Sequence, residues 1–382
     1  MIIGIDIRNI GRKRTGDEVV FLNLVRALAK IDTENEYRLF TDMRTDEELA
    51  HTVMHLEIAG KSNFRIICIP AKNRFDWNGW KIAAELRRNP IDIYHTQYIT
   101  PLLVPRRTKI FTHIHDVSFK AYPEFIRLSD RIFLDACIVP SLRRADRIVA
   151  VSEFTKQEIV KYYGEKSCEK IVVVPNAVSS EFLQSVSDEQ GDIWKKYALP
   201  KKYILSLGTL QPRKNIPMLI NAFSRLFMKD GCGDINLVIA GNRNGHNVDP
   251  RIINSVQQLG IEPFVYFPGF IDDSDVPVLM KSAMTFAFPS QYEGFGVPLL
   301  EAMSQGVPVV ASDIPAFREV AGNAALFASP FDVADFSESL YTACVSSSVR
   351  EHLVDSGFAR VGCFSWEKSA YELLSLYRKI LS

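Results

Sequence analysis

Two glutamates mark the ends of a short loop-and-helix pattern in the second half of the chain. Glu293 and Glu301 are eight positions apart, and the loop after the first of them reads Gly-Phe-Gly. Its glycines leave the backbone free to bring N–H groups close to a ligand. Pro298 suits the first turn of a helix and Gly306 suits its end, which predicts a helix over 298–305. The N-terminus of such a helix attracts anions, and two acids beside it suit a ligand that carries hydroxyls as well as phosphate.

A second group of charged residues follows an apolar strand pattern at 203–207. The loop after this strand reads GTLQPRKN over 208–215. Arg213 supplies a planar guanidinium fork and Lys214 supplies a compact charge, a combination that suits a diphosphate. A basic dipeptide alone is common on protein surfaces, so its place at the carboxyl end of a strand is what makes the pair a candidate.

A third candidate site follows the strand pattern at 109–114, which ends at His115 and Asp116. Ligands of open parallel sheets bind at the carboxyl ends of the strands, and a neighbouring carboxylate can fix the tautomer of an imidazole. Two further histidines, His95 and His113, are expected to pack in the fold or to support the site rather than to contact a ligand.

Short apolar strand patterns alternate with amphipathic helix patterns along both halves of the chain, which predicts two parallel sheets covered by helices. The first domain is expected over 1–180 and the second over 191–365, with a linker near 176–190 and a last helix in 366–382. The strands are expected at 2–7, 37–40, 64–69, 91–94, 109–114, 145–151 and 171–174, then at 203–207, 236–240, 265–267 and 285–288.

Composition limits the class of protein. The chain has 382 residues, of which 47% are hydrophobic and 24% charged, as in a soluble globular protein of two domains. No apolar run reaches the roughly 18 residues of a membrane span, and a strand pattern begins at once, which leaves no room for a signal peptide. Six scattered cysteines without a C-x-x-C pair suggest neither a zinc site nor a disulfide framework. A cytoplasmic protein is the expectation.

The net charge of zero gives no electrostatic case for nucleic-acid binding. Charge is uneven along the chain, since residues 1–180 contain 28 Lys and Arg against 23 Asp and Glu, a balance of +5. This half could rest on anionic lipid at the inner face of the membrane, or its charges could form an ordinary surface. The sequence leaves the oligomeric state unknown.

The stretch EGFGVPLLEAMSQGVPVVAS resembles the E-x7-E motif of the retaining GT-B glycosyltransferases of family 4, also called glycosyl transferases group 1. GTLQPRKN resembles the diphosphate-binding loop of that family, and VSEFTKQEIVKYYG and VVPNAV match it as well. The resemblance spans essentially the whole chain. It implies the GT-B fold, with two Rossmann-like α/β domains whose parallel sheets face each other across a cleft. It also implies a C-terminal helix that crosses back onto the first domain.

The resemblance also implies roles for single residues. His115 and Glu293 are the expected catalytic residues near the donor sugar, and Glu301 is expected to hold the ribose. The base is expected beside Phe270 and Ile271. The full set of expected donor-binding residues is Gly16, Asp116, Arg213, Lys214, Gly294, Phe295, Gly296, Val297 and Glu301. The chain departs from the family at Gly16, where a richer glycine loop is usual, and at Thr209, where some branches carry an arginine.

The reaction implied is retaining transfer of a hexose from a nucleotide diphosphate sugar to a hydroxyl of a glycan or lipid-linked saccharide. GDP-mannose is the expected donor, because GTLQPRKN resembles the wording of bacterial mannosyltransferases. No metal and no cofactor are expected, and no protein nucleophile is assigned. Alternatives are a GT-B sugar phosphorylase or epimerase, or an inactive partner subunit of a glycosyltransferase. A Rossmann dehydrogenase is disfavoured, because the first loop lacks G-x-G-x-x-G.

Overall fold

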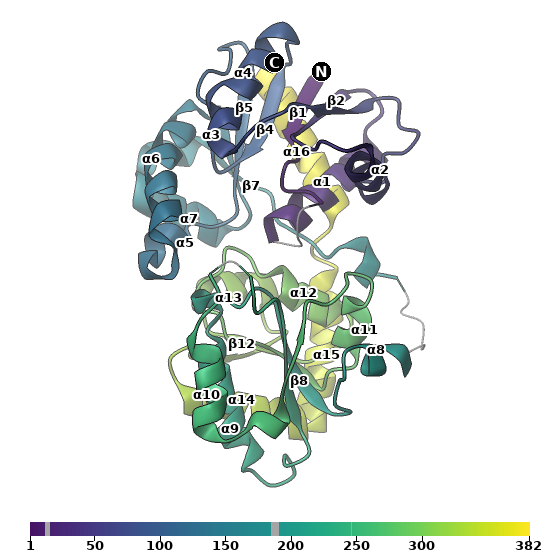
Figure 1. The fold of residues 1–382 in the computed structure, drawn as a ribbon, viewed down its shortest axis with the longest axis vertical. Coiled ribbons are helices and arrows are strands. Elements are labelled where there is room, and N and C mark those ends of the chain that lie inside the picture. The colour runs from purple at the N-terminus through teal and green to yellow at the C-terminus, as the bar shows by residue number, and fades with distance from the viewer. Residues whose placement is uncertain (12–15, 185–190, 246) are drawn as a thin grey trace. The chain divides into compact units, whose positions relative to one another are not determined.

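The computed structural model of the protein describes residues 1–11, 16–184, 191–245 and 247–382 (Figure 1). The chain forms two compact units. Unit 1 consists of Met1–Ala121, Leu128–Asn176 and Ser365–Ser382, and unit 2 consists of Tyr122–Arg127 and Ala177–Phe364. The last segment of the chain therefore belongs to the first unit.

Unit 1 is built on a parallel sheet of seven strands in the order β3-β2-β1-β4-β5-β6-β7. The order reverses beside β1, which pairs with both β2 and β4, so the carboxyl edge there is a topological switch point. The strands are β1 (Ile2–Asp6), β2 (Glu36–Thr41), β3 (Phe64–Cys68), β4 (Ile93–Gln97), β5 (Lys109–Ile114), β6 (Arg147–Ala150) and β7 (Ile171–Val173).

Helices cover this sheet, and the C-terminal helix is one of them. It packs beside α1, as the yellow and purple helices of Figure 1 show. Ser365 caps its first turn by accepting a hydrogen bond from the Lys368 N–H. The helices of unit 1 are α1 (Gly16–Ile31), α2 (Asp46–His55), α3 (Arg74–Asp76), α4 (Ile82–Arg88), α5 (Ser118–Ala121), α6 (Leu128–Arg144), α7 (Glu153–Tyr163) and α16 (Trp366–Leu381), with a π-helical turn, η1 (Trp77–Lys81), before α4.

Unit 2 repeats the design with a six-stranded sheet in the order β10-β9-β8-β11-β12-β13. Its first strand, β8, lies between β9 and β11, so a second switch point lies at the carboxyl ends of β8 and β11. The strands are β8 (Tyr203–Leu207), β9 (Asn236–Ala240), β10 (Val265–Gly269), β11 (Thr285–Phe288), β12 (Val309–Ser312) and β13 (Leu326–Ala328).

Helices cover the sheet of unit 2, and α9 among them buries Leu219, Phe223 and Leu226 in the core beside the strands. The helices are α8 (Gly191–Lys196), α9 (Ile216–Phe227), α10 (Arg251–Leu259), α11 (Val276–Lys281), α12 (Val297–Ser304), α13 (Pro315–Ala321), α14 (Val333–Val345) and α15 (Ser347–Val361).

The predicted fold class is confirmed. The chain forms two parallel-sheet α/β units, and its terminal helix returns to the first of them. None of the helices that the structure describes is both long and apolar enough to cross a bilayer.

Candidate active site

Three charged side chains meet at the switch point of unit 2. Arg213 and Lys214 follow β8, and Glu293 follows the neighbouring strand β11. Glu293 Oε1 lies 2.8 Å from an Arg213 Nη and 2.6 Å from Lys214 Nζ, and it accepts a hydrogen bond of 2.9 Å from the Ser290 hydroxyl. The structure thus brings both predicted cations onto the first glutamate of the motif.

This cluster is largely removed from water. The exposed fractions of the side chains are 17% for Arg213, 12% for Lys214 and 11% for Glu293. Burial by itself would raise the pKa of Glu293, but the two cations outweigh burial and lower that pKa to about 2. Glu293 is therefore ionised at neutral pH, and it balances about half of the positive charge that faces it.

A buried asparagine holds the loop after β8 in place. Asn215 has a left-handed backbone with φ 58°, and its amide donates hydrogen bonds to the carbonyls of Pro289 (3.2 Å) and Pro330 (2.8 Å). A backbone hydrogen bond of 2.9 Å from Gln291 N–H to Arg213 O adds a second link to the loop after β11. Because the two loops are tied together, the cations and the acid keep their positions without a ligand.

The Gly-Phe-Gly loop leads into α12 by a turn that requires glycine. Gly296 has φ 109°, and a Cβ there would lie 2.9 Å from the Phe317 ring. Phe295 is buried, with its ring 5.5 Å from that of Phe364, so it can offer a ligand its backbone but not its side chain. Glu301, one turn into α12, is 3% exposed.

A small pocket opens at the carboxyl end of β8. Its wall includes Gly208, Thr209 and Phe288 as well as Lys214. The Lys214 ammonium lies 4.7 Å from the centre of the Phe288 ring, a cation–π contact that helps to hold it at the pocket. Lys214 therefore brings positive charge to the wall of this pocket.

The carboxyl edge of the sheet in unit 1 carries His115. Its Nε2 lies 3.0 Å from the Gln97 Oε1 at the end of β4 and 4.0 Å from an oxygen of Asp17 in the first turn of α1. Gln97 thereby fixes the orientation of the imidazole. Asp116, the next residue, accepts a hydrogen bond from the Ser118 N–H, which ties it to the start of α5.

Three imidazoles stack from the core of unit 1 to this edge. The ring centres of His95 and His113 are 5.5 Å apart, and those of His113 and His115 are 4.7 Å apart. The stack ends in the core at the Tyr377 hydroxyl of α16, 2.5 Å from His95 Nδ1. Burial lowers the pKa of His95 to about 3 and, with the charges of His115 and His95, lowers that of His113 well below its usual range.

The remaining predicted residues lie at the carboxyl edges of the two sheets. Gly16 is exposed at the start of α1, whereas Thr15 before it lies outside the described residues. Phe270, which follows β10, is 54% exposed, and Ile271 beside it is buried. Within residues 1–11, 16–184, 191–245 and 247–382, no three His, Cys, Asp or Glu side chains converge as metal ligands would.

Sequence reasoning missed the residues that position the charged ones. Gln97 contacts His115 and Ser290 contacts Glu293, whereas Asn215 fixes the loop that carries Arg213 and Lys214. Their signal in the sequence was weak. Each stands in a loop or at a strand end beside a residue that had been singled out, but a polar residue at such a place is ordinary.

Family models match both halves of the chain. Residues 190–359 match the model described as glycosyl transferases group 1. Residues 14–182 match the model described as glycosyltransferase family 4.

Two relatives and two solved structures illustrate the similarity. The O-antigen chain mannosyltransferase B of Escherichia coli is 34% identical over 275 residues, which cover 72% of this chain and 71% of the relative. The serotype-specific mannosyltransferase WbdA of E. coli is 31% identical over 241 residues, which cover 62% of this chain but 29% of the relative. Sucrose-phosphate synthase from Thermosynechococcus elongatus superposes with a TM-score of 0.74 at 19% identity, over 100% of this chain and 99% of that one. Anabaena HepE in complex with UDP and glucose has the same TM-score at 15% identity, over 99% of this chain and 100% of that one.

Proposed function

The chain belongs to the glycosyl transferases group 1 and is a glycosyltransferase, and we propose that it moves mannose from GDP-mannose, with retention of configuration, to a hydroxyl of a glycan or lipid-linked saccharide. The observation that carries the proposal is the Arg213–Lys214–Glu293 cluster at the switch point of unit 2. The names of the relatives, which are mannosyltransferases of O-antigen chains, support the choice of sugar.

The chemistry of transfer explains the two cations. As the bond between the anomeric carbon and the diphosphate breaks, negative charge grows on the leaving group and positive charge grows on the sugar. Arg213 and Lys214 stabilise the leaving diphosphate, and the positive N-terminus of α12 adds to them. Because the loops that carry these groups are tied together, their backbone needs little reorganisation, although the diphosphate must take over the contacts that Glu293 makes with Arg213 and Lys214.

The remaining roles follow from position. Glu293 and His115 act near the sugar, Glu293 by opposing its developing positive charge. The backbone of Gly294, Phe295, Gly296 and Val297 approaches sugar and phosphate, and Glu301 holds the ribose. Gly16 and Asp116 contribute to donor binding from unit 1. Phe270 lies open beside Ile271 after β10, where it can flank the base.

In this proposal the leaving phosphate helps to deprotonate the acceptor, so the transfer needs no protein nucleophile and no metal. The cation pair supplies the positive charge that a divalent ion would otherwise bring to the diphosphate. We also propose that the protein works in the cytoplasm, at the inner face of the membrane, where a lipid-linked acceptor would be met.

A donor screen tests the proposal. Purified protein is heated with GDP-mannose, GDP-fucose, UDP-glucose and UDP-N-acetylglucosamine, since a ligand at a hundred times its Kd stabilises the fold by about 2.7 kcal/mol. We expect GDP-mannose to raise the Tm most and to be turned over. Turnover of a sugar phosphate with inorganic phosphate would favour a phosphorylase instead, and binding without turnover would favour an inactive partner subunit.

A further inference from the structure

Three large apolar side chains are exposed in two neighbouring segments of unit 1. Trp80 is 65% exposed, Leu102 is 65% exposed and Leu103 is 48% exposed. Trp80 lies in the turn η1, and the two leucines lie in the loop between β4 and β5. The Leu102 N–H donates a 2.8 Å hydrogen bond to the carbonyl of Asn78, two residues before the tryptophan. The two segments are therefore joined where their apolar side chains emerge.

The core beneath explains why these side chains face solvent. Trp77, Ile82 and Leu86 of the helical segment and Val104 of the loop are all buried in one cluster. The inward faces of both segments are thus filled, and Trp80 and the two leucines stand on the faces that remain. Single exposed apolar residues are ordinary, but three from two joined segments are a patch.

Arginines lie close in sequence to this patch, in α4 and in the loop between β4 and β5. Arg88, Arg106 and Arg107 are exposed, and none of the three forms an ion pair with any residue that the structure describes. Arg87 donates a hydrogen bond of 2.9 Å to the Leu103 carbonyl, which holds the end of α4 against the loop. The apolar patch therefore has a positively charged rim.

The segment that contains the patch carries an excess of positive charge. Residues 72–109 contain eight Lys and Arg against three Asp and Glu, a balance of +5. Each acid is already engaged within the fold. Asp76 accepts from the Lys72 N–H, Glu85 from the Asn89 amide and Asp92 from the Ile2 N–H. Arg74 pairs with Asp130 and Lys109 pairs with Asp146, two acids outside this segment, which together reduce the local balance from +5 to +3.

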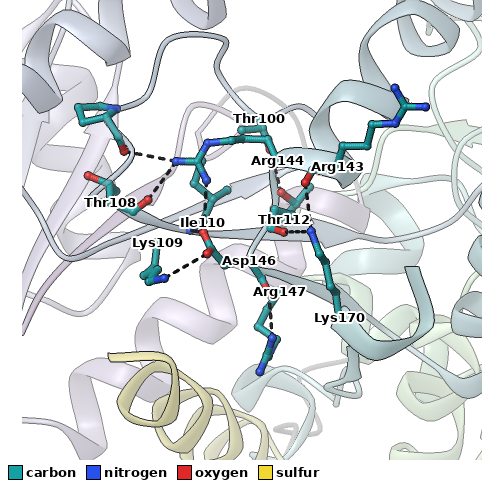
Figure 2. Close-up of polar contacts among 12 residues, drawn as sticks. Thr100, Thr108, Lys109, Ile110, Thr112, Arg143, Arg144, Asp146, Arg147 and Lys170 are labelled. Atoms are coloured by element: carbon teal, nitrogen blue, oxygen red, sulfur yellow. Dashed lines mark hydrogen bonds and ion pairs between the residues drawn. The ribbon is translucent and has the colours of Figure 1, made fainter. Parts of the chain in front are cut away.

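A clamp at the amino ends of β5 and β6 makes the loop rigid (Figure 2). The Arg144 guanidinium donates to the carbonyls of Pro105 (3.3 Å) and Thr108 (3.2 Å) and pairs with Asp146 at 3.3 Å. The loop is thus held at its base, on both sides of Arg106 and Arg107. The patch and its rim are presented as a fixed surface.

We propose that this surface, formed by Trp80, Leu102 and Leu103 with Arg88, Arg106 and Arg107, docks on a bilayer that contains anionic phospholipid. Tryptophan and leucine suit the boundary of the acyl region, and arginines suit anionic headgroups. A second copy of the chain fits less well, because a two-fold contact would oppose the same positive rims. The proposal deepens the proposed function, since it names the surface that brings the enzyme to a lipid-linked acceptor.

Sedimentation with vesicles tests the proposal and uses neither donor nor acceptor, so its failure would leave the transferase assignment standing. The full chain is mixed with vesicles of phosphatidylcholine, with or without phosphatidylglycerol, at about 0.1 M and about 1 M salt. One variant combines Trp80→Ser with Leu102→Ser, and another combines Arg106→Gln with Arg107→Gln. Matched controls are Met228→Ser with Phe331→Ser, which are 82% and 71% exposed in unit 2, and Lys195→Gln with Lys201→Gln.

We expect the wild type to sediment with the anionic vesicles at low salt and much less at high salt. Each surface variant should bind these vesicles about tenfold more weakly with an unchanged Tm, whereas the controls bind as the wild type does. The proposal is wrong if the wild type stays in solution, or if the controls lose as much binding as the surface variants. The membrane proposal would also be wrong if light scattering showed that the wild type is a dimer and that Trp80→Ser is a monomer. The surface would then serve self-association.

Discussion

The carboxylate of Glu293 lies 2.6 Å from the ammonium of Lys214, although 78 residues separate the two in the chain. The same carboxylate also pairs with Arg213, so one acid occupies both cations that a diphosphate would use. Donor binding must therefore redistribute these contacts. The acid keeps two buried cations paired while the site is empty, and it is already in place for the positive charge that develops on the sugar.

Glu293→Gln should have opposite effects on turnover and on nucleotide binding. The loss of its charge removes stabilisation of the sugar in the transition state, so kcat should fall by about a hundredfold. The same change leaves Arg213 and Lys214 without their anionic partner, so GDP should bind about tenfold more tightly. Steady-state kinetics and calorimetric titration with GDP measure the two effects.

Glu301→Gln is the matched control, because it makes the same chemical change one turn into α12. Its contact with the ribose would be present in both the ground and the transition state, so it should chiefly raise the donor KM. The division of roles would be wrong if Glu293→Gln weakened GDP binding, or if Glu301→Gln lowered kcat alone.

Arg213→Ala combined with Lys214→Ala should abolish most of the affinity for nucleotide diphosphates. Each charged hydrogen bond lost weakens binding by about 1.5–3 kcal/mol, so GDP and UDP should both bind at least about a hundredfold more weakly. Lys201→Ala combined with Lys202→Ala removes two cations at the amino end of the same strand and should change neither affinity. Calorimetric affinities equal to those of the wild type would exclude the pair as the diphosphate site.

Stability should fall as the pH drops below about 6.5, because the buried imidazoles remain neutral in the folded chain. The pKa of His95 is about 3 when folded, so the unfolded chain binds more protons between the two pKa values. This one group implies a loss of about 2 kcal/mol between pH 7 and pH 5. Urea unfolding at pH 7 and at pH 5 measures the loss, and an equal free energy of unfolding at the two pH values would contradict it.

His113→Leu separates packing from function in the stack. Neither ring nitrogen of His113 has a hydrogen-bond partner among the residues that the structure describes, so an apolar side chain of similar size should be tolerated at pH 7. The variant should also lose less stability than the wild type on acidification, because it lacks the His113 imidazole, whose pKa is lowered in the folded chain. A loss of several kcal/mol at pH 7 would show that the imidazole makes a contact that the fold requires.

Much of the fold could be predicted because periodicity and motif wording are local properties. The predicted helix over 298–305 is α12 (Val297–Ser304), and the predicted strand over 203–207 is β8 (Tyr203–Leu207). The helices between β12 and the end of unit 2 have weaker amphipathic patterns in the sequence. For α15, the buried positions Leu353 and Gly357 mark too narrow a stripe to stand out.

The site was predicted as separate pieces but not as an assembly. Arg213 and Lys214 were assigned to phosphate and Glu293 to sugar, and no spacing in the chain indicates that they form one cluster. Their contact depends on β8 and β11 being neighbours, which is a property of strand order. The stack of His95, His113 and His115 has the same origin, because it joins two paired strands.

Turnover should be insensitive to chelation. In the proposed mechanism the Arg213–Lys214 pair stabilises the diphosphate, so removal of divalent ions should leave kcat and KM for GDP-mannose unchanged. The assay compares protein treated with EDTA with the same protein after addition of Mg²⁺ or Mn²⁺. Activity that EDTA abolishes and either ion restores would require a different account of how the leaving group is stabilised.

The most direct test of the central claim is proton NMR of GDP-mannose during slow hydrolysis by the purified protein, with water in place of the acceptor. The account predicts that α-mannose and GDP appear together, that the α anomer precedes its mutarotation to β, and that Glu293→Gln slows the release of both. First appearance of β-mannose would contradict retention. The assignment of the site would be contradicted if the wild type and Glu293→Gln released mannose at the same rate, whether the donor is linked to UDP or to GDP.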